Sequence, residues 1–281
     1  AFSQAFLPIL AESKANQSDE EVQLVINHIA TKLLSILMII TLIAIVIAPL
    51  IILLFAWGFY FKADATQFNL ASDMLRITFP YLLLISLTAL SGSILNTYDN
   101  FIIPAFTPVL LNISLILSAV FLSKYLSTPI MALAWGVLIG GTIQLGFQIP
   151  FLRKIKRLPK LQFGHHKALS ILRKRMLPAL FGVSVSQINL LVDTMIASTL
   201  IAGSVSWLYY SDRLLELPLA LIGIALATVA LAKLSNYHAK KDTKNFINTI
   251  DKALLYAILL GLPACAGLVL LAEELIITLF Q

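Results

Sequence analysis

Three charged residues stand close together beside a long apolar stretch, and they are the strongest candidates for chemistry in this sequence. Asp212 and Arg213 are adjacent, and Glu216 follows them just before the apolar run 217–232. In a helix, Glu216 shares one face with Arg213 (i, i+3) and with Asp212 (i, i+4). A guanidinium suits a pyrophosphate because its planar fork donates two parallel hydrogen bonds and keeps its charge.

The position of Arg213 within a membrane-length segment leaves two interpretations. A charged side chain at bilayer depth costs several kcal/mol, so it must face water or a partner. Either the three charges pair internally and anchor the helix at the interface, or they face a water-filled cavity and bind an anionic substrate. We favour the cavity, because the cluster lies two to three turns inside the expected helix 204–236.

Asp193 is the second candidate, because it interrupts the stretch 176–211, which has no other charge. Gly182, Ser186, Asn189 and Asp193 are spaced by three or four residues and would form a polar stripe on one helix face. Such stripes commonly provide hydrogen bonds between membrane helices. An acidic member favours the other interpretation, an ion or proton site.

The composition requires that these residues be positioned by membrane helices. Of the 281 residues, 59% are hydrophobic and 12% are charged, against about 45–50% and about 25% in soluble domains. Uncharged runs at 33–61, 77–98, 100–123, 125–152 and 253–272 reach the ~20 residues that cross a bilayer. A soluble enzyme is excluded, and so is a β-barrel, whose strands alternate over about ten residues.

Hydropathy therefore predicts an all-α, polytopic membrane protein with about seven complete helices and part of one. The partial helix covers 1–11 and ends at the polar stretch 12–21. The complete helices are expected at about 24–60, 70–97, 102–123, 127–152, 168–201, 204–236 and 246–280. Short links between several of them make neighbours antiparallel. Prolines inside these segments predict bends.

The basic residues orient this bundle. Sixteen of the 20 Lys and Arg residues fall on one face, with nine in 153–175, five in 233–252, and Lys14 and Lys32 beside the first link. Only Lys62, Arg76 and Lys124 fall on the other. The positive-inside rule places the first face in the cytoplasm, so the net charge of +6 does not indicate a nucleic-acid partner.

The basic link 153–175 is the longest connection, and we expect it to divide two lobes, 1–157 and 158–281. Its charges either hold an amphipathic stretch at anionic headgroups or serve only as a topology signal. The single Cys265 excludes a disulfide framework. No motif for hydrolysis, nucleotide binding or metal-dependent prenyl transfer is present, so we expect a protein that is not an enzyme and needs no cofactor beyond, at most, a sodium ion.

Several strings of residues resemble one family along the whole chain and in the same order. They are AFSQAFLPILAE (1–12), ITFPY (77–81), GSILNT (92–97), PAFTP (104–108), LNIS (111–114), GVSVSQ (182–187), GSVSW (203–207) and YSDRL (210–214). The chain is similar in these strings to the MurJ (MviN) family of lipid II flippases, within the multidrug/oligosaccharidyl-lipid/polysaccharide exporter superfamily.

The resemblance implies a fold and a function. The fold would be a two-lobe helix bundle around a central cavity, of which this chain would hold helices two (in part) to nine, as an internal fragment. The function would be to flip lipid II, an undecaprenyl-pyrophosphate-linked disaccharide-pentapeptide, across the bacterial inner membrane for peptidoglycan and cell-wall synthesis. The implied mechanism is alternating access by a monomer surrounded by membrane lipids.

The resemblance also implies residue roles. Arg213 matches a cavity arginine that the flippase needs, Asp212 and Glu216 match its acidic neighbours, and Ser206 matches a cavity-lining serine. Asp193 matches the position of an aspartate that binds sodium in some members. Where the family has Leu-Pro-Ser-Leu-Ser, this chain has LAKLS at 231–235, so we expect the helix not to break there.

Three alternatives to a lipid II flippase are compatible with these residues. The first is an exporter of drugs or of another lipid-linked saccharide from the same superfamily, which would share the fold. The second is an intramembrane transferase, which would make or break a bond. The third is a non-transporting remnant of a truncated gene.

Overall fold

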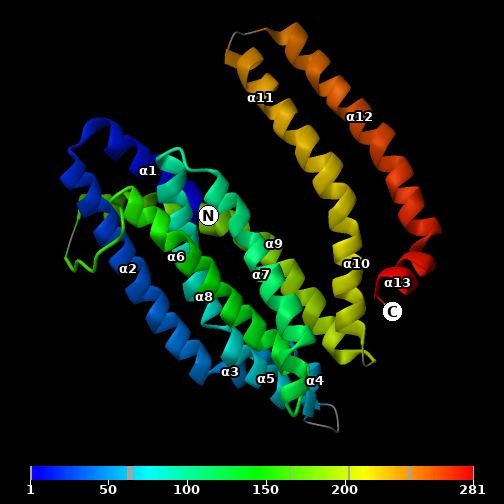
Figure 1. The fold of residues 1–281 in the computed structure, drawn as a ribbon. Helices are drawn as coiled ribbons and strands as arrows, with labels where there is room; N and C mark the ends of the chain where they lie inside the picture. Colours follow the sequence, from blue (N-terminus) through cyan, green and yellow to red (C-terminus); the bar gives the residue numbers. More distant parts are fainter. Residues whose placement is uncertain (1, 62–65, 165, 202, 240–241, 281) are drawn as a thin grey trace. The chain divides into compact units, whose positions relative to one another are not determined.

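The computed structural model is built of helices, and it describes residues 2–61, 66–164, 166–201, 203–239 and 242–280 (Figure 1). No strand occurs among these residues. The α-helices are α1 (Phe2–Asn16), α2 (Asp19–Val46), α3 (Ala48–Phe55), α4 (Gly58–Phe61), α5 (Thr66–Thr78), α6 (Tyr81–Thr97), α7 (Ile102–Val120), α8 (Met131–Lys154), α9 (Lys167–Thr199), α10 (Ser204–Pro218), α11 (Ala225–Ala239), α12 (Thr243–Leu270) and α13 (Ala272–Phe280). A 3-10 helix, η1 (Leu122–Tyr125), and a π-helix, η2 (Leu219–Ile224), complete the described elements.

Six helical segments of the described part are long and apolar enough to cross a membrane, which confirms a polytopic helical membrane protein. They are Asp19–Val46, Thr66–Thr97, Ile102–Val120, Met131–Lys154, Ser204–Leu231 and Thr243–Leu270. Each lies within a few residues of a predicted span or inside one. The remaining predicted span, 168–201, is filled by the 33-residue helix α9, which is not among the six.

The first helix ends within the polar stretch 12–21, as predicted, but five residues later than the expected end at residue 11. Helix α1 continues to Asn16, and α2 begins at Asp19. The start of α2 is fixed by a capping box, in which the Ser18 side chain accepts from the Glu21 backbone and the Glu21 side chain accepts from the Ser18 backbone. These reciprocal bonds satisfy free N–H groups at the helix start, so the two helices need almost no link between them.

Prolines break two of the predicted spans, as expected for residues that lack a backbone donor. The span predicted at 24–60 is interrupted at Ile47, and α3 starts with Pro49 in its first turn. The span predicted at 70–97 is divided between α5 and α6, with Pro80 at the N-cap of α6.

Polar side chains buried between membrane helices hold α7 against α8. Gln144 Nε2 donates to Thr107 O (3.2 Å), and Gln148 Nε2 donates to Thr107 Oγ1 (2.9 Å). Ser114 Oγ donates to Gly136 O (2.8 Å). Both glutamines are almost completely buried, at 2% and 1% exposure. Bonds of this kind join membrane helices where the hydrophobic effect cannot.

The connection from α8 to α9, residues 155–166, is here called the linker, and it lies along α2. A positive φ at Lys156 turns the chain as α8 ends, and Arg157 then donates to Asp19 O (2.8 Å) and pairs with the Asp19 carboxylate. Three α2 side chains bond to alternate linker residues: Gln23 Nε2 donates to Leu158 O (3.0 Å), Asn27 Oδ1 accepts from Lys160 N (2.8 Å), and Thr31 Oγ1 accepts from Gln162 N (2.8 Å).

The chain forms two compact units, Ala1–Thr199 and Leu200–Gln281. In the first, α9 contacts α1, α2, α3 and α4. In the second, α11 and α12 run side by side (Figure 1). The border between lobes that the sequence predicts at 157/158 rests on the basic link and on the resemblance, and it stays a prediction beside this division.

Candidate functional site

The charged cluster lies on α10, and a glycine sets where this helix begins. Gly203 is the N-cap and has a φ of 99°, a conformation that side chains with a Cβ rarely adopt. Helix α10 then runs without interruption through Ser206, Asp212, Arg213 and Glu216. All four predicted residues of the anion site therefore lie on one helix within the span Ser204–Leu231.

The structure joins Arg213 to two neighbours on its own helix. Arg213 Nη1 donates to Glu216 Oε2 at 2.6 Å. Its guanidinium carbon also lies 4.8 Å from the centre of the Tyr209 ring, which is the geometry of a cation–π contact. Tyr209, one turn before Arg213, and Glu216, one turn after it, therefore hold the guanidinium. The shared helix face predicted for Arg213 and Glu216 is confirmed. Their ion pair is the internal pairing of the anchor interpretation, and the cavity interpretation stays a prediction.

These contacts do not bury the arginine. The Arg213 side chain is 53% exposed, and that of Glu216 is 60% exposed. The guanidinium is thus held in a defined direction while about half of its side chain stays exposed in this unit.

Ser206 and Asp212 extend the same helix surface in different ways. Ser206 is exposed and stands seven residues, or nearly two turns, before Arg213, on its side of the helix. Asp212 is half-buried and precedes Arg213 directly, so it points to a neighbouring sector of the helix. Their assigned roles in lining a cavity stay predictions.

Helix α10 ends in a π-helical segment that the sequence analysis missed. Pro218 closes α10, and η2 (Leu219–Ile224) follows at once. A proline removes a backbone donor, and π-helical turns mark places where helices yield and often accompany functional sites. Beyond this segment α11 runs continuously through residues 231–235, which confirms that the helix does not break at LAKLS.

Asp193 lies on α9 in the first compact unit, whereas the arginine cluster lies on α10 in the second. The side chains of Asp193 and Asn189 are exposed. The side chains of Gly182 and Ser186, which complete the predicted stripe, lie outside the described residues. Across the described parts of both units, no group of three His, Cys, Asp or Glu residues could hold a metal ion. The sodium role of Asp193 stays a prediction.

Tyr209 is the member of the site that the sequence analysis did not single out. Its ring stacks edge to face with Tyr210 at 6.0 Å, and Tyr210 in turn stacks on Phe280 of α13 at 4.3 Å. The spacing of Tyr209 and Arg213 (i, i+4) places an aromatic face beside a cation on one helix side. That spacing was the available signal.

Comparisons with known proteins give one family throughout. The sequence model described as "Lipid II flippase MurJ" matches residues 1–281. A "Probable lipid II flippase MurJ" of Haemophilus influenzae is 44% identical over all of this chain and 58% of its own length. The protein of the same description from Vibrio cholerae is 45% identical over all of this chain and 55% of its own length.

A solved structure shows the same likeness in three dimensions. The structure titled "Lipid II flippase MurJ, inward closed conformation" matches with a TM-score of 0.80 and 32% sequence identity, covering 98% of this chain and 55% of that chain. The chain thus spans little more than half the length of the relatives it matches.

Proposed function

Because the chain belongs to the MurJ family of lipid II flippases, we propose that the protein it represents flips lipid II across the bacterial inner membrane. Transport requires no bond to be made or broken in the substrate, so we do not assign it an enzymatic role. The substrate would be the undecaprenyl-pyrophosphate-linked precursor of peptidoglycan, and the working unit would be a monomer among membrane lipids.

The observation that carries this proposal is the half-exposed Arg213 on a membrane-length helix. A guanidinium at this depth needs water or an anion beside it, and its two neighbours hold it without covering it. A pyrophosphate would accept the fork of parallel hydrogen bonds that Arg213 can donate. Ser206 would lie on the same side of the helix as that anion, whereas the carboxylates of Asp212 and Glu216 would act on the guanidinium and not on the anion itself.

The transport step would be alternating access between two lobes, 1–157 and 158–281. A ligand shifts such an equilibrium only by binding one state more tightly, and a tenfold shift needs about 1.4 kcal/mol of differential affinity. Sodium binding at Asp193 would favour one facing of the empty carrier. The proposed sodium coupling depends on Asp193 of α9, whereas the proposed substrate binding depends on Arg213 of α10.

The test is lipid II flipping by the full-length protein with Arg213→Ala, in cells depleted of their own flippase. We expect export of lipid II to fall to background while membrane insertion is unchanged, because the anion contact is lost but the exposed pair contributes little to folding.

The matched control is Arg76→Ala. Arg76 also forms an exposed i, i+3 pair, with Asp73 at 2.8 Å, and we expect flipping to persist without it. Lipid II export by Arg213→Ala at the level of Arg76→Ala would refute the assigned role. If Arg213→Ala kept lipid II export but lost export of a drug or of another lipid-linked saccharide, a different exporter of the superfamily would be favoured.

A further inference from the structure

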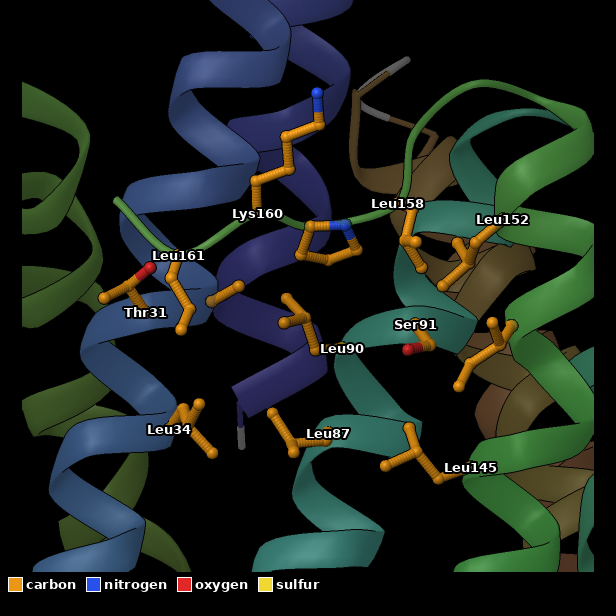
Figure 2. Close-up of a pocket in the computed structure, with 13 residues that line it drawn as sticks. Thr31, Leu34, Leu87, Leu90, Ser91, Leu145, Leu152, Leu158, Lys160 and Leu161 are labelled. Atoms are coloured by element: carbon orange, nitrogen blue, oxygen red, sulfur yellow. The ribbon is translucent and has the colours of Figure 1, made fainter. Parts of the chain in front are cut away.

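The first unit contains an apolar cavity of about 190 Å³ that the proposed transport step does not use. It lies between α2, α6 and α8, beneath the linker, and its walls are mainly leucine side chains (Figure 2). Leu90 and Leu152 are almost completely buried, at 1% exposure each. Leu34, Leu87 and Leu145 line the end of the cavity away from the linker (Figure 2). An apolar cavity of about 150 Å³ stays dry and can hold a benzene-sized group.

The roof of this cavity is built from the linker and is held in place by α2. Leu158, Pro159, Lys160 and Leu161 all line it. The hydrogen bonds from Gln23, Asn27 and Thr31 fix the backbone of this stretch at alternate residues. The cavity is therefore a preformed feature and lies wholly within one compact unit.

The cavity is partly open, and the side of the linker that faces away from it is positively charged. The Lys160 backbone lines the roof, whereas its ammonium points away from the leucines (Figure 2). Arg153, Lys154 and Lys156 are exposed at the end of α8 and the start of the linker, and Lys32 is exposed on α2 beside Thr31. The positive-inside rule places this end of the unit at the cytoplasmic surface, where anionic lipid headgroups attract basic residues.

We propose that this cavity binds an anionic glycerophospholipid of the cytoplasmic leaflet. A stretch of one acyl chain would fill the space between α2, α6 and α8, and the lipid phosphate would pair with Lys160. The charge on the outer side of the linker and the apolar lining beneath it match the headgroup and the acyl chain of such a lipid, in the same order. The site is complete without Arg213 and Asp193, so it does not depend on the proposed function.

The experiment is native mass spectrometry of the full-length protein titrated with phosphatidylglycerol or with phosphatidylcholine. We expect phosphatidylglycerol to bind more tightly. Lys160→Gln should weaken it about fivefold, since each basic residue near a membrane surface contributes about that factor. Ala30→Leu, which adds a side chain inside the cavity, should weaken it about tenfold by displacing about two methylenes.

The matched controls are Lys124→Gln and Ala119→Leu, two exposed positions on η1 and α7, and both should bind like the unmodified protein. Lys160→Gln is a surface change and keeps the test valid if Ala30→Leu prevents folding. Phosphatidylglycerol binding unaffected by both cavity variants would overturn the proposal, as would equal affinity for phosphatidylcholine. A third titration uses undecaprenyl phosphate. If Lys160→Gln and Ala30→Leu weakened its binding and left phosphatidylglycerol binding intact, the cavity would be assigned to a polyprenyl lipid and the proposal would be overturned.

Discussion

Described polar side chains of the membrane helices bond between helices in the first compact unit, whereas those of the arginine cluster bond within one helix in the second. In the first, Gln144, Gln148 and Thr107 are buried and bond across the contact of α7 with α8. In the second, no described residue is buried, and Arg213 bonds only to Glu216 and Tyr209 of its own helix in the contacts described above. The described amides therefore serve packing between helices, whereas the described contacts of Arg213 stay within its own helix.

Packing explains why the first unit can bury such groups. Gly136, Gly140 and Gly141 of α8 lie against side chains of α6 and α7, close enough that a Cβ would be within 3 Å of a neighbouring atom. Small residues let membrane helices approach closely, and close approach makes hydrogen bonds between them possible. By contrast, a Cβ added to Gly261 or Gly267 of α12 would have nothing within 4 Å.

The largest effect expected from this contrast is that of Gly141→Ala. The added Cβ would lie 2.6 Å from Tyr81 Cδ2 and 3.2 Å from Leu84 Cβ, so α6 and α8 must separate. Overpacking of this kind costs about 1–3 kcal/mol. Thermal unfolding of the full-length protein in detergent measures the loss.

Two matched changes give the control for that prediction. Gly146→Ala in the same helix and Gly261→Ala in the second unit meet nothing within 4 Å, so both should unfold like the parent. If all three variants unfolded alike, the close approach of α8 would not stabilise the first unit, and the contrast between the units would fail.

A smaller effect is expected from Tyr209→Leu, which removes the aromatic face beside Arg213. The guanidinium would then lose one of its two supports, and binding of undecaprenyl pyrophosphate should weaken about two- to fivefold, the range of an exposed cation–π contact. Tyr209→Phe keeps the ring face but removes the hydroxyl, which also bonds to Arg213, so its binding should lie between that of the parent protein and that of Tyr209→Leu. Equal weakening by both substitutions would indicate that the hydroxyl, and not the ring face, supports the arginine.

The smallest effect concerns pH. His166, in the linker, stacks on His28 of α2 with ring centres 5.2 Å apart. Partial burial, and then the charge of His28, lower the pKa of His166 below its ordinary value. The neutral form is therefore favoured on folding, so the contribution to stability is complete above pH ~6.5 and is lost as the pH falls below it.

His166→Gln should consequently lose less stability than the parent between pH 7.5 and 5.5. We expect a difference in Tm of less than about 2 °C, because a single partly exposed group is involved. His28→Gln should act in the same direction, since it removes the neighbouring charge. An unchanged pH dependence in both variants would show that folding does not lower the pKa of His166.

Much of the fold could be predicted from hydropathy, because apolar runs of membrane length admit few structures other than helices. The spans, the bends at Pro49 and Pro80 and the intact helix at 231–235 follow from residue types alone. The start of α2 was also within reach, since Ser18 and Glu21 form the S-x-x-E pattern of a capping box.

Other features depend on contacts between distant residues and could not be predicted. Gln23 and Leu158 are 135 positions apart, and nothing in either segment alone indicates that the linker would lie on α2. Of the candidate site, the shared face of Arg213 and Glu216 followed from helix geometry, whereas their ion pair belongs to the anchor interpretation that the sequence analysis did not favour. The roles of Ser206 and Asp193 could not be predicted from α10 and α9 alone, because they depend on which other parts of the protein face these helices.

The central claim is that Arg213 is accessible to water and lies where the pyrophosphate of the substrate binds. The most direct measurement is labelling of Arg213→Cys, in a cysteine-free full-length protein, by a charged, membrane-impermeant thiol reagent. The account predicts that this thiol reacts and that undecaprenyl pyrophosphate slows its reaction. Either of two results would contradict it. The thiol does not react with the charged reagent added from either side of the membrane, or it reacts at the same rate with and without bound undecaprenyl pyrophosphate.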